Sequence, residues 1–141
     1  DDLVSLIAKR ERPGASILYL CGRIRTGDLD TKLAEKDFQC RLAELYTVEI
    51  VSYPTEYFGN LLDRQAPDAI LFHSAFSASA FTANVFPHFP HGFENTTFFM
   101  LSARIAAVLP AALTPRVTVS AEPNERALLA SLRAALPSAG N

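Results

Sequence analysis

The sequence has no excess of basic charge, few cysteines and no long apolar run. Its 13 lysine and arginine residues face 15 aspartate and glutamate residues, and no basic cluster occurs. This balance argues against a nucleic-acid-binding surface. The longest apolar stretch, residues 105–113, is broken by Pro110 and is far too short to span a bilayer. The two cysteines, Cys21 and Cys40, predict a reduced pair, which is typical of a cytoplasmic protein.

Signature motifs of several common chemistries are also missing. Neither G-x-G-x-x-G nor G-x-x-x-x-G-K-[ST] occurs, which argues against the usual nucleotide sites. Ser74 lacks the flanking glycines of a nucleophile elbow, and no aspartate stands at Phe72 or His73, where a receiver domain would need one. A metal site from His73, His88 and His91 is conceivable, but a solvated aromatic loop is favoured. We therefore expect no metal and no cofactor.

What the sequence does contain is a regular alternation of apolar runs and helical patterns. Hydrophobic residues make up 49% of the chain and charged residues 20%, which predicts a packed globule. Alternation of this kind predicts an α/β fold with right-handed crossovers. The leading arrangement is a three-layer, parallel, five-stranded, flavodoxin-like sheet of order 2-1-3-4-5. The five expected strands lie in residues 17–21, 41–51, 68–72, 97–101 and 117–120.

Residues 68–81 form the central unit of this pattern. A short apolar run ends at His73, and Ser74 and Ser77 follow as candidate helix N-caps before a helical spacing resumes. In open parallel sheets, ligands bind beyond the carboxyl ends of the strands. These three polar residues therefore mark the edge at which a binding site is expected first.

The ordered series of blocks resembles the uroporphyrinogen-III synthase family. Residues 17–23 are similar to a strand-glycine-helix block in the second half of that family. Residues 44–46 resemble its strand that ends in tyrosine at an interdomain linker, and residues 69–74 resemble its strand that ends in serine. Residues 101–109 and 117–132 are similar to its last two strand-helix blocks. The motifs are short, and their order along nearly the whole chain carries the resemblance.

The resemblance implies that the chain is one lobe, the C-terminal half, of a two-lobed HemD-like fold. Residues 1–46 would correspond to the end of the second lobe, residues 47–56 to a linker, and residues 57–141 to the C-terminal part of the first lobe. A single flavodoxin-like domain over residues 1–141 is the alternative. The chain begins at Asp1 rather than at methionine, so we expect a cut or a missing N-terminal part.

The same resemblance implies a hydro-lyase of tetrapyrrole and heme biosynthesis that uses no cofactor. Its substrate, linear hydroxymethylbilane, loses water and closes to uroporphyrinogen III with ring D inverted. Tyr46 is the implied proton donor to the leaving hydroxide. Gly22, Ser74, Ser102 and Arg104 are expected to contact the substrate, whose carboxylates suit helix N-termini. Many family members have threonine where this chain has Arg104, which weakens that assignment. No nucleic-acid or membrane partner is implied.

Two questions stay open at this stage. The chain is either part of an enzyme or a non-catalytic, flavodoxin-like binding or interaction module. Separately, residues 47–56 either fold back, so that residues 17–21 pair beside residues 69–72 in a closed lobe, or stay extended and give a strand-exchanged dimer. The closed lobe is favoured because closing so short a loop costs little entropy. In both cases we expect little activity from the chain alone.

Overall fold

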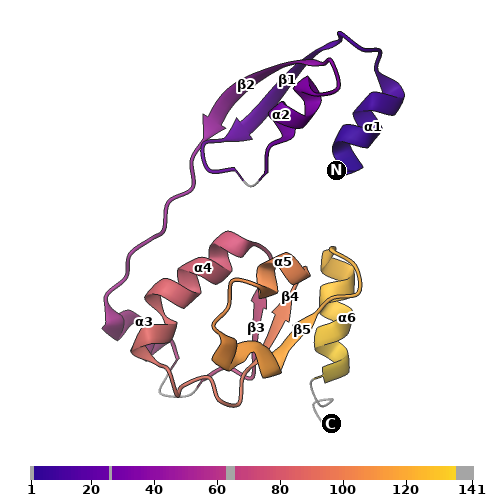
Figure 1. Ribbon diagram of the computed structural model, residues 1–141. Helices are drawn as coiled ribbons and strands as arrows, with labels where there is room; N and C mark the ends of the chain where they lie inside the picture. The colour runs from indigo at the N-terminus through magenta and orange to yellow at the C-terminus, as the bar shows by residue number, and fades with distance from the viewer. Residues whose placement is uncertain (1, 26, 63–65, 136–141) are drawn as a thin grey trace. The chain divides into compact units, whose positions relative to one another are not determined.

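The computed structural model describes residues 2–25, 27–62 and 66–135 (Figure 1). The chain divides into two compact units, Asp1–Ile50 and Val51–Asn141. Each unit has its own cluster of buried apolar side chains, and the two clusters share no residue. We therefore describe each unit by itself.

The first unit is a two-stranded parallel sheet with helices on one face. In chain order its elements are α1 (Asp2–Arg10), β1 (Ser16–Gly22), α2 (Leu29–Ala34) and β2 (Gln39–Tyr46).

The core of this unit lies between the sheet and its helices. Val4 of α1, Leu33 of α2 and Phe38 are buried together, and Ile17 and Cys40 of the two strands pack against them. Ile17 and Cys40 are register partners, so they share one face of the sheet. Side chains alternate along a strand, so Leu18 and Leu20 point to the other face, where they are 61% and 55% exposed.

The second unit contains a three-stranded parallel sheet of order β3-β4-β5. Phe72 of β3 is the register partner of Met100 in β4, which pairs with Val119 of β5. In chain order its elements are α3 (Thr55–Leu61), β3 (Ala69–Phe72), α4 (Ala75–Asn84), the 3-10 helix η1 (Phe86–His88), β4 (Thr97–Met100), α5 (Ala103–Ala106), the 3-10 helix η2 (Ala111–Arg116), β5 (Val117–Val119) and α6 (Glu125–Ala135).

The central strand β4 is covered on both faces, as a parallel sheet requires. Helices α4 and α5 lie on one side of the sheet and α6 on the other (Figure 1). Phe98 and Met100 are fully buried in the first of these layers, together with Phe81 of α4. The Phe81 ring packs edge-on against Phe93, with ring centroids 5.1 Å apart. Aromatic contacts of this type add to the stabilisation that burial already gives.

The α/β class and the parallel pairing agree with the sequence, but the expected single five-stranded sheet is not formed. The strands lie in two separate sheets, and β1 pairs with β2 rather than with β3. The closed-lobe pairing of residues 17–21 beside residues 69–72 is therefore absent. Residues 47–54, between β2 and α3, form no helix or strand and are exposed throughout. The assignment of residues 1–46, 47–56 and 57–141 to particular lobes stays a prediction.

Within the described ranges, every helix is too short or too polar to cross a membrane.

Candidate functional site

Two of the predicted site residues, Ser74 and Ser102, lie at the carboxyl edge of the three-stranded sheet. Each stands two positions beyond the last register pair of its strand, Phe72 with Met100. A hydrogen bond from the Leu101 amide to the Phe72 carbonyl, 3.1 Å long, continues the pairing past the strand ends. The two serines therefore occupy equivalent positions on neighbouring strands, where parallel sheets place their ligands.

Ser74 is the N-cap of α4, as the sequence predicts. Its Oγ accepts a hydrogen bond from the Ser77 amide at 3.1 Å, and the Ser77 hydroxyl donates to the Ser74 carbonyl at 2.8 Å. The two hydroxyl oxygens are 3.1 Å apart, so the Ser74 hydroxyl can donate to Ser77. This closed set of bonds fixes the start of α4, whose first amides have no partner within the helix. Both serines are exposed and accessible to a ligand.

Ser102 holds the same position before α5 but bonds differently. Its backbone carbonyl accepts from the Ile105 amide at 3.0 Å, while its side chain makes no capping hydrogen bond. Arg104 lies two residues further on, in a helix of four residues, and its side chain is exposed. The structure thus places three of the predicted residues at one edge of one sheet.

A third serine at this edge, Ser120, was not among the residues predicted from the sequence. It follows β5, it is 8% exposed, and its amide donates to the Met100 carbonyl at 2.9 Å. Its hydroxyl lies 3.1 Å from the Leu101 carbonyl and 2.6 Å from the Glu122 carbonyl. Because one hydroxyl has one proton to donate, it can bond to only one of the two carbonyls at a time. The sequence does contain a pattern that points to Ser120, since each of three successive apolar runs in this part of the chain is followed by a serine.

The other two predicted residues, Gly22 and Tyr46, meet in the first unit. They are register partners at the ends of β1 and β2, and the Arg23 amide donates to the Tyr46 carbonyl at 2.9 Å. A Cβ atom on Gly22 would stand 2.7 Å from Tyr46 Cε2, so the ring lies directly against the glycine. The position accepts the ring because it carries no side chain. Tyr46 is nevertheless 63% exposed, which leaves much of the ring accessible to a ligand.

A small pocket adjoins this tyrosine. It has a volume of about 210 Å³ and is lined by Arg23, Glu44, Leu45, Tyr46 and Thr47. Arg23 Nε lies 3.5 Å from Glu44 Oε2, and both side chains are well exposed, so the ion pair contributes little to stability. The volume is below the usual range for a whole ligand, about 300–1,000 Å³, and suits one substituent. Arg23, which was not among the residues predicted from the sequence, adds a cation beside the predicted proton donor.

The three histidines considered for a metal site do not form one group among the described residues. His73 follows β3 at the carboxyl edge of its sheet, whereas His91 precedes β4 and is paired with Glu94 at 3.0 Å. In the part of the chain that the structure describes, no group of three or more metal-binding side chains is found.

Both cysteines are free thiols. Cys21 is buried, and its Sγ is 3.7 Å from Arg25 Nη1. Desolvation by burial raises the pKa of the Cys40 thiol, which keeps it protonated at neutral pH.

Comparison with known proteins adds to this geometry. The fold is similar to that in the crystal structure of uroporphyrinogen-III synthetase from Helicobacter pylori 26695, with a TM-score of 0.61 and 21% sequence identity. The similarity covers 94% of this chain and 57% of that one, so the chain spans little more than half the length of that protein. None of the curated proteins matches the sequence. The sequence model of the uroporphyrinogen-III synthase HemD family matches residues 1–130, and the chain belongs to this family.

Proposed function

We propose that the protein acts as a uroporphyrinogen-III synthase, which converts hydroxymethylbilane to uroporphyrinogen III and water. The observation that carries this proposal is the family match, which covers residues 1–130. The contact between Gly22 and Tyr46 supports it, because it joins two of the five residues that the resemblance implied. The carboxyl edge with Ser74 and Ser102 supplies a second group of candidate contacts.

The proposed reaction needs acid catalysis at one bond, and it needs the rest of the linear substrate to be held in a conformation that allows ring closure. The bond between the terminal methylene carbon and its hydroxyl oxygen breaks, and the oxygen leaves as water after it gains a proton. The resulting pyrrole-stabilised cation is attacked by a ring D carbon, and rearrangement of this ring inverts it. A final proton loss restores the aromatic pyrrole, so protons balance. No atom is oxidised or reduced overall, which is why we propose that no cofactor takes part.

In this proposal Tyr46 donates the proton to the departing hydroxide. A positioned general acid typically contributes about 10²–10⁴ to the rate. The position of the ring against Gly22 supports this role, because the contact limits where the hydroxyl can lie. Arg23, in the same pocket, is a candidate partner for a substrate carboxylate.

We propose that the second unit binds carboxylates of the substrate at the carboxyl edge of its sheet. The Ser74 hydroxyl and the first amides of α4 are the candidate donors, and the helix dipole favours an anion there. Ser102 supports the same role, because its hydroxyl makes no capping bond and can donate a hydrogen bond to a ligand. Arg104 contributes positive charge two residues later.

The test is an isomer assay. Hydroxymethylbilane would be generated in situ and offered to the 141-residue chain and to any longer natural polypeptide that contains it. The products would then be oxidised to porphyrins and separated by chromatography. We expect the type III isomer from the longer polypeptide and little of it from the 141-residue chain alone, whereas unassisted closure leaves ring D uninverted. If neither polypeptide yields more type III isomer than a protein-free control, the proposal fails and a non-catalytic binding module becomes the better explanation.

A further inference from the structure

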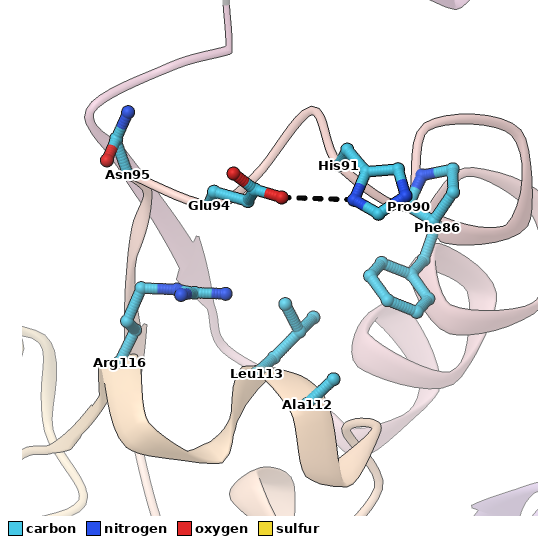
Figure 2. Close-up of a pocket in the computed structure, with 8 residues that line it drawn as sticks. All are labelled: Phe86, Pro90, His91, Glu94, Asn95, Ala112, Leu113 and Arg116. Atoms are coloured by element: carbon cyan, nitrogen blue, oxygen red, sulfur yellow. Dashed lines mark hydrogen bonds and ion pairs between the residues drawn. The ribbon is translucent and has the colours of Figure 1, made fainter.

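The second unit has a pocket at the amino edge of its sheet, the edge opposite Ser74 and Ser102. It lies between the loop that leads into β4 and the 3-10 helix η2 that leads into β5 (Figure 2). The pocket has a volume of about 640 Å³, within the range of small-molecule sites. We call it the amino-edge pocket and define it by Phe86, His91, Glu94, Leu113 and Arg116.

Arg116 gives this pocket an unsatisfied cationic donor. Its Nε is a buried side-chain nitrogen without a hydrogen-bond partner among the described residues. Figure 2 shows the guanidinium directed beneath Glu94 toward the middle of the pocket. A buried donor without a partner is costly. Because this Nε has almost no accessible surface, a carboxylate in the pocket would be held by the charge of the guanidinium and by its terminal N–H groups.

One side of the amino-edge pocket is formed by apolar residues, and its base is well anchored. Leu113 is 1% exposed, and in Figure 2 its side chain and that of Phe86 lie across from the Arg116 guanidinium. The loop that carries His91 and Glu94 is held by Phe93, which is also 1% exposed. The pocket is thus formed by the fold itself. An apolar group bound in it would be removed from water, which favours binding.

Negative charge at the rim limits what can bind. Glu94 Oε1 is 3.0 Å from His91 Nδ1, and both side chains are well exposed. The Glu94 carboxylate would repel a second anionic group on a ligand, because like charges at short range disfavour binding. A ligand with one carboxylate is therefore preferred over a dicarboxylate or a phosphate.

We propose that the amino-edge pocket binds a small monocarboxylate with an apolar body. The carboxylate is held by Arg116, and the apolar body lies against Phe86 and Ala112, which line the pocket and are more accessible than Leu113. The site is independent of the proposed synthase reaction, because all of its residues lie at the opposite edge of the sheet from Ser74 and Ser102.

The experiment uses hexanoate as the probe and the full chain labelled with ¹⁵N. We expect saturable amide shifts in residues 86–95 and 112–116, and none with hexanamide, which has the same length and no charge. Arg116→Met should weaken hexanoate binding by about tenfold or more, since it removes a charge-assisted hydrogen bond. The matched control is Arg133→Met in α6, which should leave binding unchanged.

Arg116→Met is chosen because methionine keeps the length of the side chain and removes a donor that burial leaves unpaired, so the variant is expected to fold. Glu94→Gln should let glutarate, a dicarboxylate, bind nearly as well as hexanoate. Absence of hexanoate shifts in the wild-type chain would overturn the proposal, as would shifts elsewhere on the protein. Equal binding by Arg116→Met and wild type would also overturn it, and the wild-type shifts decide the matter even if that variant fails to fold.

Discussion

At the scale of single residues, the close packing of the Tyr46 ring depends on one position that has no side chain. Gly22 lies under the Tyr46 ring, and its φ is not in the left-handed region. Gly22 therefore matters because it leaves room for the ring, and not because glycine allows an unusual backbone conformation. A predicted catalytic residue and a predicted contact residue turn out to form one local structure, in which the glycine sets where the phenol can lie.

In a longer natural polypeptide that contains this chain, Tyr46→Phe is expected to lower turnover of hydroxymethylbilane by about 100-fold, because the variant retains the ring and loses the acid. Stability should change by less than about 0.5 kcal/mol, since the side chain is 63% exposed. Isomer-resolved product analysis and urea unfolding measure the two effects. Unchanged turnover in a folded variant would remove Tyr46 from the mechanism.

A second pair of variants tests whether the Gly22 contact positions Tyr46. In Gly22→Ala the new Cβ would stand 2.7 Å from the ring, which must move. Turnover should then fall as it does in Tyr46→Phe, and the double variant should be no worse than either single one. Gly59→Ala is the control, because nothing lies within 4 Å of a Cβ at that position of α3.

Ser74→Ala is expected to cost about 1 kcal/mol of unfolding free energy, because its side chain caps α4. Ser102→Ala is the matched control at the equivalent position of the next strand. Its side chain makes no capping bond, so we expect a change near zero. Urea unfolding of both variants measures the difference, and equal costs would contradict the distinction drawn between the two serines.

At the scale of elements, apolar runs predicted strands well where turn-forming residues flank the run on both sides. The runs at residues 68–72, 97–101 and 117–120 became β3, β4 and β5 with ends shifted by one residue or less. The extended stretch at residues 41–51 became β2 only as far as Tyr46, because exposed apolar residues continue the pattern beyond the strand. Pairing between strands was not predictable, since short parallel strands carry little information about their neighbours.

The candidate site was predictable to a similar degree. The Ser74 cap follows from the local spacing of Ser74 and Ser77, which the structure confirms. The amino-edge pocket was missed, because it joins side chains from Phe86 to Arg116 that form no motif in sequence. Arg23 was missed for the same reason, since only the pairing of β1 with β2 brings it beside Tyr46.

The two faces of β1 should respond differently to truncation. Ile17 packs against the core of the first unit, so Ile17→Ala is expected to cost about 2 kcal/mol. Leu18, the next residue, is 61% exposed on the opposite face, so Leu18→Ala should cost less than about 0.5 kcal/mol. Equal costs in denaturant unfolding would show that the outer face is covered in solution.

At the scale of the whole molecule, the chain consists of two units with separate cores. Leu33 is fully buried in the first core, and Leu113 is 1% exposed in the second. Each core belongs to a sheet whose strands pair only with one another among the described elements. Local stability should therefore be set separately in each unit.

Leu33→Ala is expected to cost about 2–5 kcal/mol in the first unit and to speed amide hydrogen exchange only there. Leu113→Ala should do the same in the second unit. Residue-resolved exchange measured by NMR distinguishes the two patterns. If either variant accelerated exchange throughout both units, the chain would be unfolding as one cooperative body.

The outward face of β1 has a consequence for the life of the chain in a cell. Leu18 and Leu20 stand side by side on a two-stranded sheet and are more than half exposed. Chaperones bind exposed apolar strand segments, and proteases degrade chains that expose them. We expect this exposed face to shorten the half-life of the polypeptide, and a pulse-chase would then show a longer half-life for Leu18→Gln than for wild type.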